Sequence, residues 1–367
     1  MRAVLLTLAL FITACSSEAP EDSLAVGDAL GGVAAAGFAR ADSPRQFIFP
    51  ADHAAHPAYR NEWWYLTGNL ETPDGNPLGY QLTLFRIALA PGSPESPSAW
   101  ATHQVWMAHV AVSDVAAAEH HHAERYARGA AGLAGQSMRP FRVWLEDWQI
   151  RGEANGRFPW TIDVDAGDFA LQLTVEPVRS PILQGDNGLS QKSAAPGNAS
   201  YYYSITRLAT RGEVRVGGTS HTVAGMSWLD REWSTSALGD DQAGWDWFSL
   251  QLDSGEDLMV YRLRRNDGST DPYSAGAWVD TQGNAETLGS NDFTLREERF
   301  WTSESGRRYP VSWTLASDGR APELRVEALL DNQEMRTSVR YWEGAVSVSS
   351  VVSGEILGHG YLEMTGY

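Results

Sequence analysis

From residue 46 onward the chain is a succession of short runs in which apolar and polar residues alternate, as in half-buried β-strands. In residues 79–88 (GYQLTLFRIA), for example, Leu82, Leu84 and Arg86 would share one face of a strand. The pattern predicts strands at residues 61–70, 79–88, 105–112, 142–150, 160–164, 169–175, 201–207, 213–216, 222–229, 245–252, 258–264, 275–280, 309–315, 323–328, 340–347 and 360–364. We therefore expect an all-β protein.

Only one stretch in this part of the chain has a reasonable helical pattern, residues 115–128, with Asp114 as its N-cap. It contains three consecutive histidines, His120, His121 and His122. Consecutive side chains on a helix point in different directions, so we expect these three to be solvated surface residues.

A polar segment that is rich in glycine and aspartate, residues 234–244, divides the strands into two groups. Each group opens with a tryptophan-rich strand, followed by a tight glycine turn and a strand that carries arginine: Arg86 in the first group, Arg262 and Arg264 in the second. This loose similarity between the two groups predicts two antiparallel β-barrel domains in tandem, residues 46–233 and 244–367.

The first 45 residues have a different character. An apolar run that follows Arg2 ends in small residues at Cys15, and it is too short to span a bilayer. Residues 1–15 resemble the signal peptide and lipobox of bacterial lipoproteins, which implies cleavage before Cys15, acylation of this cysteine and anchoring in the periplasm. Ser16 is compatible with sorting to the outer membrane. A plain secretory signal is the alternative, and residues 16–45 indicate a flexible tether.

The net charge is −18, and 27 of the 28 basic residues are arginine, Lys192 being the only lysine. So acidic a chain is a poor partner for nucleic acid or for an anionic lipid surface. Cys15 is the only cysteine, so the folded domains must be stable without disulfide bonds.

The candidate chemistry centres on residues 226–252, where tryptophans enclose carboxylates. Asp230 and Glu232 would share one strand face and Arg231 the other. One interpretation is a buried ion-pair network, with Arg231 bound to Glu232 and Asp230 capping a turn. The other is a ligand pocket with Asp230 as its acid, Glu232 as a second carboxylate, and four tryptophans that bind the substrate: Trp228, Trp233, Trp245 and Trp247.

Other candidates are weaker. His53 and His56 lie in a proline-flanked loop without an acidic partner at helical spacing, so packing of the loop is favoured over metal binding. His109 could face a barrel interior as a base, and Glu62 is either functional or a partner for Arg86. The sequence has no Gly-x-Ser-x-Gly nucleophile elbow and no glycine-rich phosphate loop.

Six segments together resemble the AttH-type "predicted secreted hydrolase" proteins, which are related to the carotenoid 1,2-hydratases. The segments are residues 49–56 (FPADHAAH), 62–70 (EWWYLTGNL), 228–233 (WLDREW), 244–248 (GWDWF), 341–345 (YWEGA) and 360–367 (GYLEMTGY). The resemblance covers residues 47–367 and implies two lipocalin-like (calycin) β-barrels.

The resemblance also implies chemistry. The hydratases add water to a terminal double bond without metal or organic cofactor, and their essential aspartate corresponds to Asp230. Where those enzymes use a histidine and a tryptophan upstream of this aspartate, the chain has Tyr201 and Tyr203; we take Tyr203 as a group that positions water, and Tyr201 with Trp64 as substrate-binding aromatics. The missing histidine is a departure from the hydratase pattern.

Two function classes remain open. One is an enzyme that adds water, with acid assistance, to a hydrophobic isoprenoid or lipid-like substrate. The other is a non-catalytic carrier that holds an apolar molecule, as barrels of this size often do. Both predict a hydrophobic small molecule as partner and neither requires a cofactor or metal; the sequence indicates no protein partner.

Overall fold

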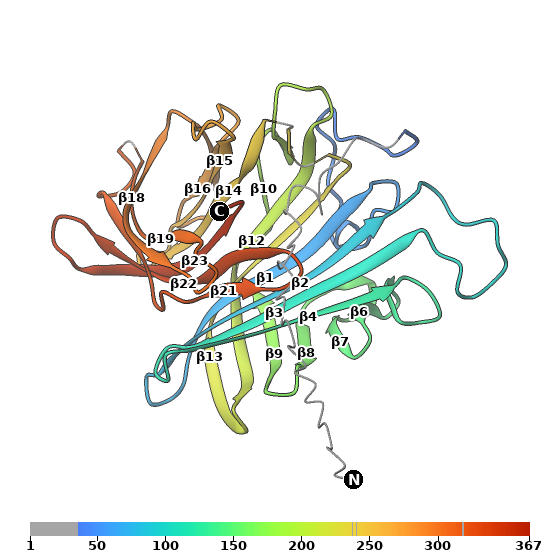
Figure 1. Ribbon diagram of the computed structural model, residues 1–367, viewed down its shortest axis with the longest axis horizontal. Coiled ribbons are helices and arrows are strands. Elements are labelled where there is room, and N and C mark those ends of the chain that lie inside the picture. Colours follow the sequence, from blue (N-terminus) through green and yellow to red (C-terminus); the bar gives the residue numbers. More distant parts are fainter. Residues whose placement is uncertain (1–35, 237, 240, 318) are drawn as a thin grey trace, which may run out of the picture.

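The computed structural model describes residues 36–367 except residues 237, 240 and 318. The predicted signal peptide, Cys15 and most of the predicted tether lie outside the described residues. The described chain is all-β, as predicted, with two antiparallel sheets and only two one-turn helices, η1 (Ala51–His53) and η2 (Ala154–Gly156) (Figure 1).

The first sheet is a nearly closed barrel whose main path runs β4-β3-β2-β1-β13-β12-β9-β8-β7-β6-β5, with β10 and β11 paired to β12. Its strands are β1 (Asn61–Glu71), β2 (Pro77–Ala88), β3 (Gln104–Asp114), β4 (Glu119–Arg128), β5 (Ala134–Met138), β6 (Phe141–Leu145), β7 (Trp148–Arg151), β8 (Trp160–Asp165), β9 (Phe169–Pro177), β10 (Ile182–Leu183), β11 (Leu189–Gln191), β12 (Ala199–Val216) and β13 (Thr219–Ser234).

The second sheet is a half-barrel in the order β17-β16-β15-β14-β23-β22-β20-β19-β18, with β21 paired to β22. Its strands are β14 (Gln242–Leu252), β15 (Asp257–Arg265), β16 (Ala275–Val279), β17 (Ala285–Gly289), β18 (Phe293–Thr302), β19 (Arg308–Ser317), β20 (Leu324–Ala328), β21 (Glu334–Arg336), β22 (Arg340–Ser350) and β23 (Ile356–Thr365).

The predicted helix over residues 115–128 is wrong. The chain turns after Asp114 and returns as β4, which pairs with β3 along its whole length. Pairing with a neighbouring strand outweighs the modest helical preference of this alanine-containing segment. On the strand, His120 and His122 share one face: His120 lies 2.9 Å from Ser113 Oγ, and His122 Nε2 accepts a hydrogen bond from the backbone of Arg336 in the other domain. These two histidines are therefore partly buried rather than solvated.

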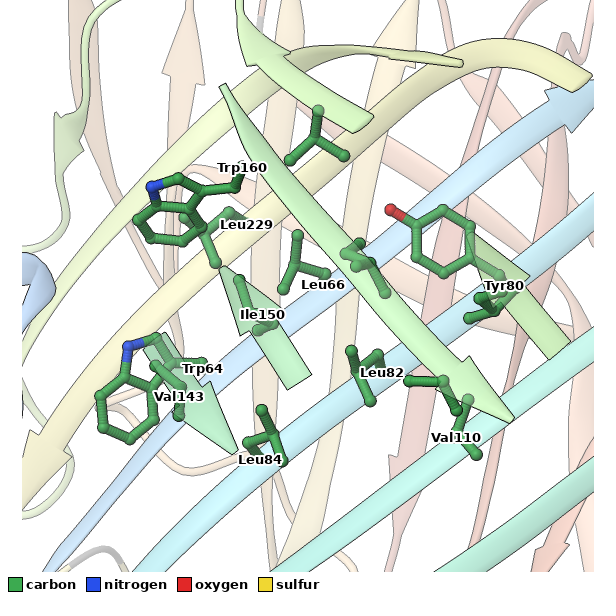
Figure 2. Packing of buried hydrophobic residues seen from close by; sticks show 14 of the residues in the cluster. Trp64, Leu66, Tyr80, Leu82, Leu84, Val110, Val143, Ile150, Trp160 and Leu229 are labelled. Atoms are coloured by element: carbon green, nitrogen blue, oxygen red, sulfur yellow. The ribbon is translucent and has the colours of Figure 1, made fainter. Parts of the chain in front are cut away.

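Aromatic and aliphatic side chains fill the interior of the first barrel (Figure 2). Trp64 of β1 and Trp160 of β8 lie there with leucines from β1 and β2 such as Leu66 and Leu82. A barrel packed in this way is a core, as expected for a small barrel whose inward side chains occupy its interior. A carrier that holds its ligand inside this barrel is therefore disfavoured.

The two sheets pack against each other through their outer faces. Strands β1 and β2 contact β23 and β22, and β12 contacts β14 (Figure 1). An apolar cluster separate from both cores fills this contact, which we call the interdomain face: Tyr65, Tyr202, Trp228, Trp247, Met259, Tyr261, Leu263, Ala345 and Tyr361. The domains are thus joined by aromatic packing as well as by the connection between β13 and β14.

Candidate functional site

Successive residues on the central strands of the first sheet point alternately into the barrel and toward the second sheet. On β13, Leu229 belongs to the barrel core, whereas Trp228 belongs to the interdomain face. Asp230 is aligned with Tyr65 of β1 and with Ser204 of β12 in the sheet register. The alternation therefore brings Asp230 to the interdomain face.

A cavity of about 90 Å³, which we call the central cavity, lies at the interdomain face. Its walls combine aromatic rings and two leucines with one lysine and three carboxylates: Trp63, Tyr65, Lys192, Tyr202, Asp230, Glu232, Leu238, Trp245, Trp247, Tyr261, Leu263 and Glu363. A mostly apolar cavity with a few converging polar groups is typical of a small-molecule site.

Asp230 is held in place by three hydrogen bonds. Its Oδ1 accepts from Ser204 Oγ at 2.5 Å and from Trp228 Nε1 at 2.7 Å, and its Oδ2 accepts from the Tyr202 hydroxyl. Trp247 Nε1 in turn donates to the Tyr202 hydroxyl at 3.2 Å. Burial raises the pKa of Asp230 to about 7, against the lowering effect of the three hydrogen bonds. This carboxyl is therefore partly protonated at neutral pH, as a general acid must be.

Glu232, two residues along the same face, has a different partner. Lys192 Nζ lies 3.3 Å from Glu232 Oε1 and 4.3 Å from the centre of the Tyr261 ring. Burial alone would lower the pKa of Lys192, but the carboxylate of Glu232 raises it. The only lysine of the whole sequence is thus a buried cation at the wall of the central cavity.

A smaller cavity of about 30 Å³ adjoins the central one and shares Tyr65, Trp245 and Glu363 with it. Its walls also include His109 and Glu343. Burial and the neighbouring Glu363 raise the pKa of Glu343 well above its usual range. Burial likewise raises the pKa of Glu363 to about 7, although Trp245 Nε1 donates to it at 2.9 Å. Two further carboxyls therefore line the adjoining cavities, and the charge of Asp230 acts on one of them, Glu363.

His109 lies at this smaller cavity and not in a barrel interior, which corrects the orientation expected from the sequence. Its Nε2 donates to Glu124 Oε1 at 2.8 Å, because a carboxylate can only accept. In that tautomer its Nδ1 accepts from the Tyr341 hydroxyl, also at 2.8 Å. His109 thus connects the first domain to β22 of the second.

Four residues that the sequence analysis placed at the site lie on the other side of the sheet. Trp64, Tyr201, Tyr203 and Trp233 belong to the core of the first barrel. The Tyr203 hydroxyl, for instance, lies 2.6 Å from Nδ1 of His53 and cannot position water at Asp230. Each is one strand residue away from a side chain that faces the second sheet, and a shift of one residue reverses the face.

Arg231 also points into the first barrel, so the ion pair between Arg231 and Glu232 that one interpretation expected is not formed. Its guanidinium contacts Glu62 Oε2 at 3.0 Å, and Arg86 contacts the other oxygen of Glu62. Glu62 is therefore the structural partner of two buried arginines. Burial alone would raise the pKa of Glu62, but these arginines hold it far below its usual range.

His53 and His56 belong to the packing of their loop, His56 being stacked on Trp233 with ring centres 3.7 Å apart. His56 Nε2 also lies 3.1 Å from Asp52 Oδ1, so the expectation that the loop has no acidic partner at helical spacing is wrong. Among the residues that the structure describes, no three His, Cys, Asp or Glu side chains are grouped as metal ligands. In the same part of the chain, no helix has the length and apolar character needed to cross a bilayer.

The cavity residues that the sequence analysis missed include two tyrosines and one lysine of the central cavity and two glutamates: Tyr65, Tyr202, Lys192, Glu343 and Glu363. Signals for three of them were present. Glu343 and Glu363 each stand two residues after an aromatic residue, as Asp230 does, and Lys192 is the only lysine. The two tyrosines carry no signal of their own, because only the strand face distinguishes them from their neighbours.

A family model described as AttH-like matches residues 40–367. A search of curated proteins finds no match. A crystal structure of a protein of Nitrosomonas europaea assigned to AttH is 36% identical, with a TM-score of 0.79 over 89% of this chain and 99% of that one.

Two more distant structures share the fold. Kievitone hydratase from Nectria haematococca is 14% identical, with a TM-score of 0.64 over 90% of this chain and 98% of its own. The protein CghA is 13% identical, with a TM-score of 0.52 over 92% and 97% of the two chains. At these identities the likeness shows a common fold and nothing more.

Proposed function

The chain belongs to the AttH-like family, and from this premise we propose that it is a hydratase-type enzyme that adds water to a carbon–carbon double bond in the central cavity. The observation that carries the proposal is Asp230, a buried carboxyl with a pKa of about 7 at the wall of an aromatic cavity. The name of kievitone hydratase, which has the same fold, is consistent with this class of reaction.

The first step of such a reaction needs an acid that is strong enough to protonate carbon and is shielded from water. The proton of Asp230 forms a new C–H bond with the electron pair of the double bond, leaving Asp230 ionised and the substrate as a tertiary cation. Trp228, Trp245 and Trp247 lie around or beside Asp230, and an aromatic face stabilises a nearby cation by roughly 0.5–2 kcal/mol.

In the second step a water oxygen bonds to the cationic carbon and loses a proton to the carboxylate of Asp230, which restores the acid. Tyr202 and Ser204 keep this carboxylate in one position during both transfers, since each donates a hydrogen bond to it. The sum of the steps is alkene plus water giving a tertiary alcohol, and no other reagent is consumed.

The size of the cavity limits what can react in it. About 90 Å³ admits the reacting end of a substrate but not a long isoprenoid chain. An open groove of about 560 Å³ shares Tyr261 with the central cavity, and Ser190 on its wall lies 3.1 Å from the Tyr261 hydroxyl. We place the remainder of the substrate in this groove.

A carrier without catalytic activity is the second candidate, and one observation favours it. Both oxygens of Asp230 already accept hydrogen bonds, as expected of a carboxyl that maintains the shape of a binding site. A carrier of this kind would bind its ligand at the interdomain face.

The experiment that separates the two begins with the ligand that co-purifies with the protein, identified by mass spectrometry. Protein labelled with ¹³C-lysine then reports occupancy of the cavity through a single side-chain signal, because Lys192 is the only lysine. Incubation in ¹⁸O-labelled water tests turnover. An enzyme incorporates the label, and Asp230→Asn lowers the rate by at least ~10²-fold while the lysine signal still responds to ligand.

Ser204→Ala serves as the matched control, since it removes one hydrogen bond to Asp230 but leaves the acid in place. A bound ligand without incorporation of ¹⁸O in the wild-type protein identifies a carrier. Incorporation at the normal rate by folded Asp230→Asn protein removes Asp230 from the mechanism.

We further propose that the protein acts in the periplasm from a lipid anchor on Cys15, as its lipobox-like sequence suggests. One acyl chain holds a protein weakly, whereas several chains anchor it durably. Cys15→Ser should therefore move the protein from the membrane fraction to the soluble periplasmic fraction. Retention of the variant in the membrane fraction would contradict the anchor.

A further inference from the structure

Two glutamates, one buried and one half-buried, face each other at the interdomain face. Glu343 of β22 and Glu363 of β23 are directly opposed in the antiparallel register, so their side chains lie on the same side of the sheet. Glu343 is 1% exposed, and Glu363 is half-buried and lines both cavities. Glu343 is thus enclosed by protein, and Glu363 faces the cavities.

No cation compensates this pair among the residues that the structure describes. The groups that act on their charge are the phenols of Tyr65 and Tyr341 beside Glu343 and the carboxyls of Asp230 and Glu232 beside Glu363. Trp245 Nε1 donates one hydrogen bond to Glu363, and neither oxygen of Glu343 accepts a well-formed one from the described residues. Two opposed carboxylates without a cation cannot both ionise at low cost, so one of them keeps a proton.

A row of side chains leads from Glu343 to the surface, joined by hydrogen bonds from Tyr341 onward. The Tyr341 phenol, which lies beside Glu343, donates to Nδ1 of His109, and Nε2 of His109 donates to Glu124. The Glu124 side chain is 19% exposed and also accepts hydrogen bonds from Ser338. The path therefore crosses from the second domain through the first and ends at solvent.

We propose that Glu343 and Glu363 form a second acid–base centre of the cavities, holding one proton between them, and that Tyr341 and His109 exchange this proton with Glu124 at the surface. The centre is a property of the resting protein and does not depend on hydration being the reaction.

From Tyr341 onward each donor points toward Glu124, and a hydrogen bond from protonated Glu343 to the Tyr341 oxygen completes the path. When protonated Glu343 gives its proton to the Tyr341 oxygen, Tyr341 gives its own to Nδ1 of His109, and Nε2 of His109 gives its proton to Glu124. One O–H bond is lost at Glu343 and one is formed at Glu124, while Tyr341 and His109 remain neutral. The cavities can thus exchange a proton with solvent at Glu124.

Infrared spectroscopy of the resting protein tests the shared proton, because protonated and ionised carboxyls absorb at different frequencies. Glu343→Gln and Glu363→Gln should each lower the pH midpoint of the carboxyl that remains, by about one unit or more, since each removes a like charge. If each substitution removes only its own signal and leaves the other midpoint unchanged, the two groups do not share a proton and the proposal is overturned.

Protein labelled with fluorotryptophan gives a second test that needs no change at the pair. The ¹⁹F resonance that is absent from Trp245→Phe belongs to the indole that donates to Glu363. Its frequency should titrate near neutral pH. A resonance that stays constant between about pH 5 and about pH 9 would overturn the shared proton even if both glutamine variants failed to fold.

The path is tested by the rate at which the buried carboxyl signal exchanges hydrogen for deuterium. Tyr341→Phe should slow this exchange by about tenfold or more, because the phenol hydroxyl is the link between Glu343 and His109. Tyr126→Phe is the matched control: its hydroxyl contacts Ser338 near Glu124 but lies off the path. Unchanged exchange in Tyr341→Phe, or equal slowing in both variants, would contradict the path.

Discussion

The raised pKa of Asp230 has a measurable effect on stability, which Asp230→Asn isolates. A carboxyl whose pKa is higher in the folded state than in the unfolded state binds more protons when folded. Its contribution to stability is fully present below the unfolded value of 3.8 and is lost as the pH rises through the folded value of about 7. Asparagine does not titrate, so the variant lacks this loss.

The magnitude follows from the two pKa values. A rise from 3.8 to about 7 corresponds to about 4 kcal/mol in total, at about 1.4 kcal/mol per pH unit. Of this, roughly 2 to 3 kcal/mol is lost between about pH 5 and about pH 8. The free energy of unfolding of Asp230→Asn, relative to wild type, should therefore rise by that amount across the interval. Glu363 adds to the difference between the two proteins. In the wild-type protein the charge of Asp230 hinders ionisation of Glu363, and Asp230→Asn removes that charge.

Urea unfolding of both proteins at a series of pH values measures this difference. Asp246→Asn is the matched control, because Asp246 is equally buried but lies 2.8 Å from Arg262 Nε and 3.2 Å from Arg264 Nε. Removing that carboxylate leaves two arginines without this partner, so the control should be destabilised by the loss of an ion pair. If the difference between Asp230→Asn and wild type stays constant or falls from pH 5 to 8, Asp230 is ionised in the folded protein and cannot be the acid.

Two further predictions concern packing and burial. Glu62→Gln should destabilise the protein by about 3–5 kcal/mol in urea unfolding, because it leaves the buried Arg86 and Arg231 uncompensated; a loss below about 1 kcal/mol would contradict the structural role of Glu62. Gly79→Val should separate the domains, because a Cβ at position 79 would lie 2.7 Å from Cβ of Ala345 across the interdomain face. Faster proteolysis of residues 235–241 would show the separation, and unchanged cleavage would argue against close packing there.

The strand pattern was enough to predict the all-β class and to locate most strands, because alternation records which side chains are buried. It was also enough to place Asp230 and Glu232 on one face and Arg231 on the other. The family resemblance is confirmed by the match over residues 40–367. What alternation does not record is which of the two faces of a buried strand meets a core and which meets another domain. In a strand that is buried on both faces, both sets of residues are apolar.

The misplaced residues follow from this ambiguity. Tyr201 and Tyr203 flank Tyr202, and nothing in their side chains shows that only Tyr202 reaches Asp230. Trp64 likewise lies in the barrel core, while its neighbour Trp63 lines the central cavity. The prediction of a helix over residues 115–128 was wrong for another reason. This segment pairs with β3, and the local sequence does not show that it has a strand partner.

The position of the cavities between two sheets explains how so many carboxyls remain buried together. Asp230 lies on the first domain, whereas Glu343 and Glu363 lie on the second. Each domain has its own apolar core. Enclosing these acids therefore weakens the contact at the interdomain face and leaves the stability of both cores unaffected. A fold that did not use them would gain stability by replacing the opposed glutamates with apolar residues. The presence of both glutamates on the second-domain wall of the cavities, opposite Asp230 on the first, is therefore better explained by proton transfer than by stability.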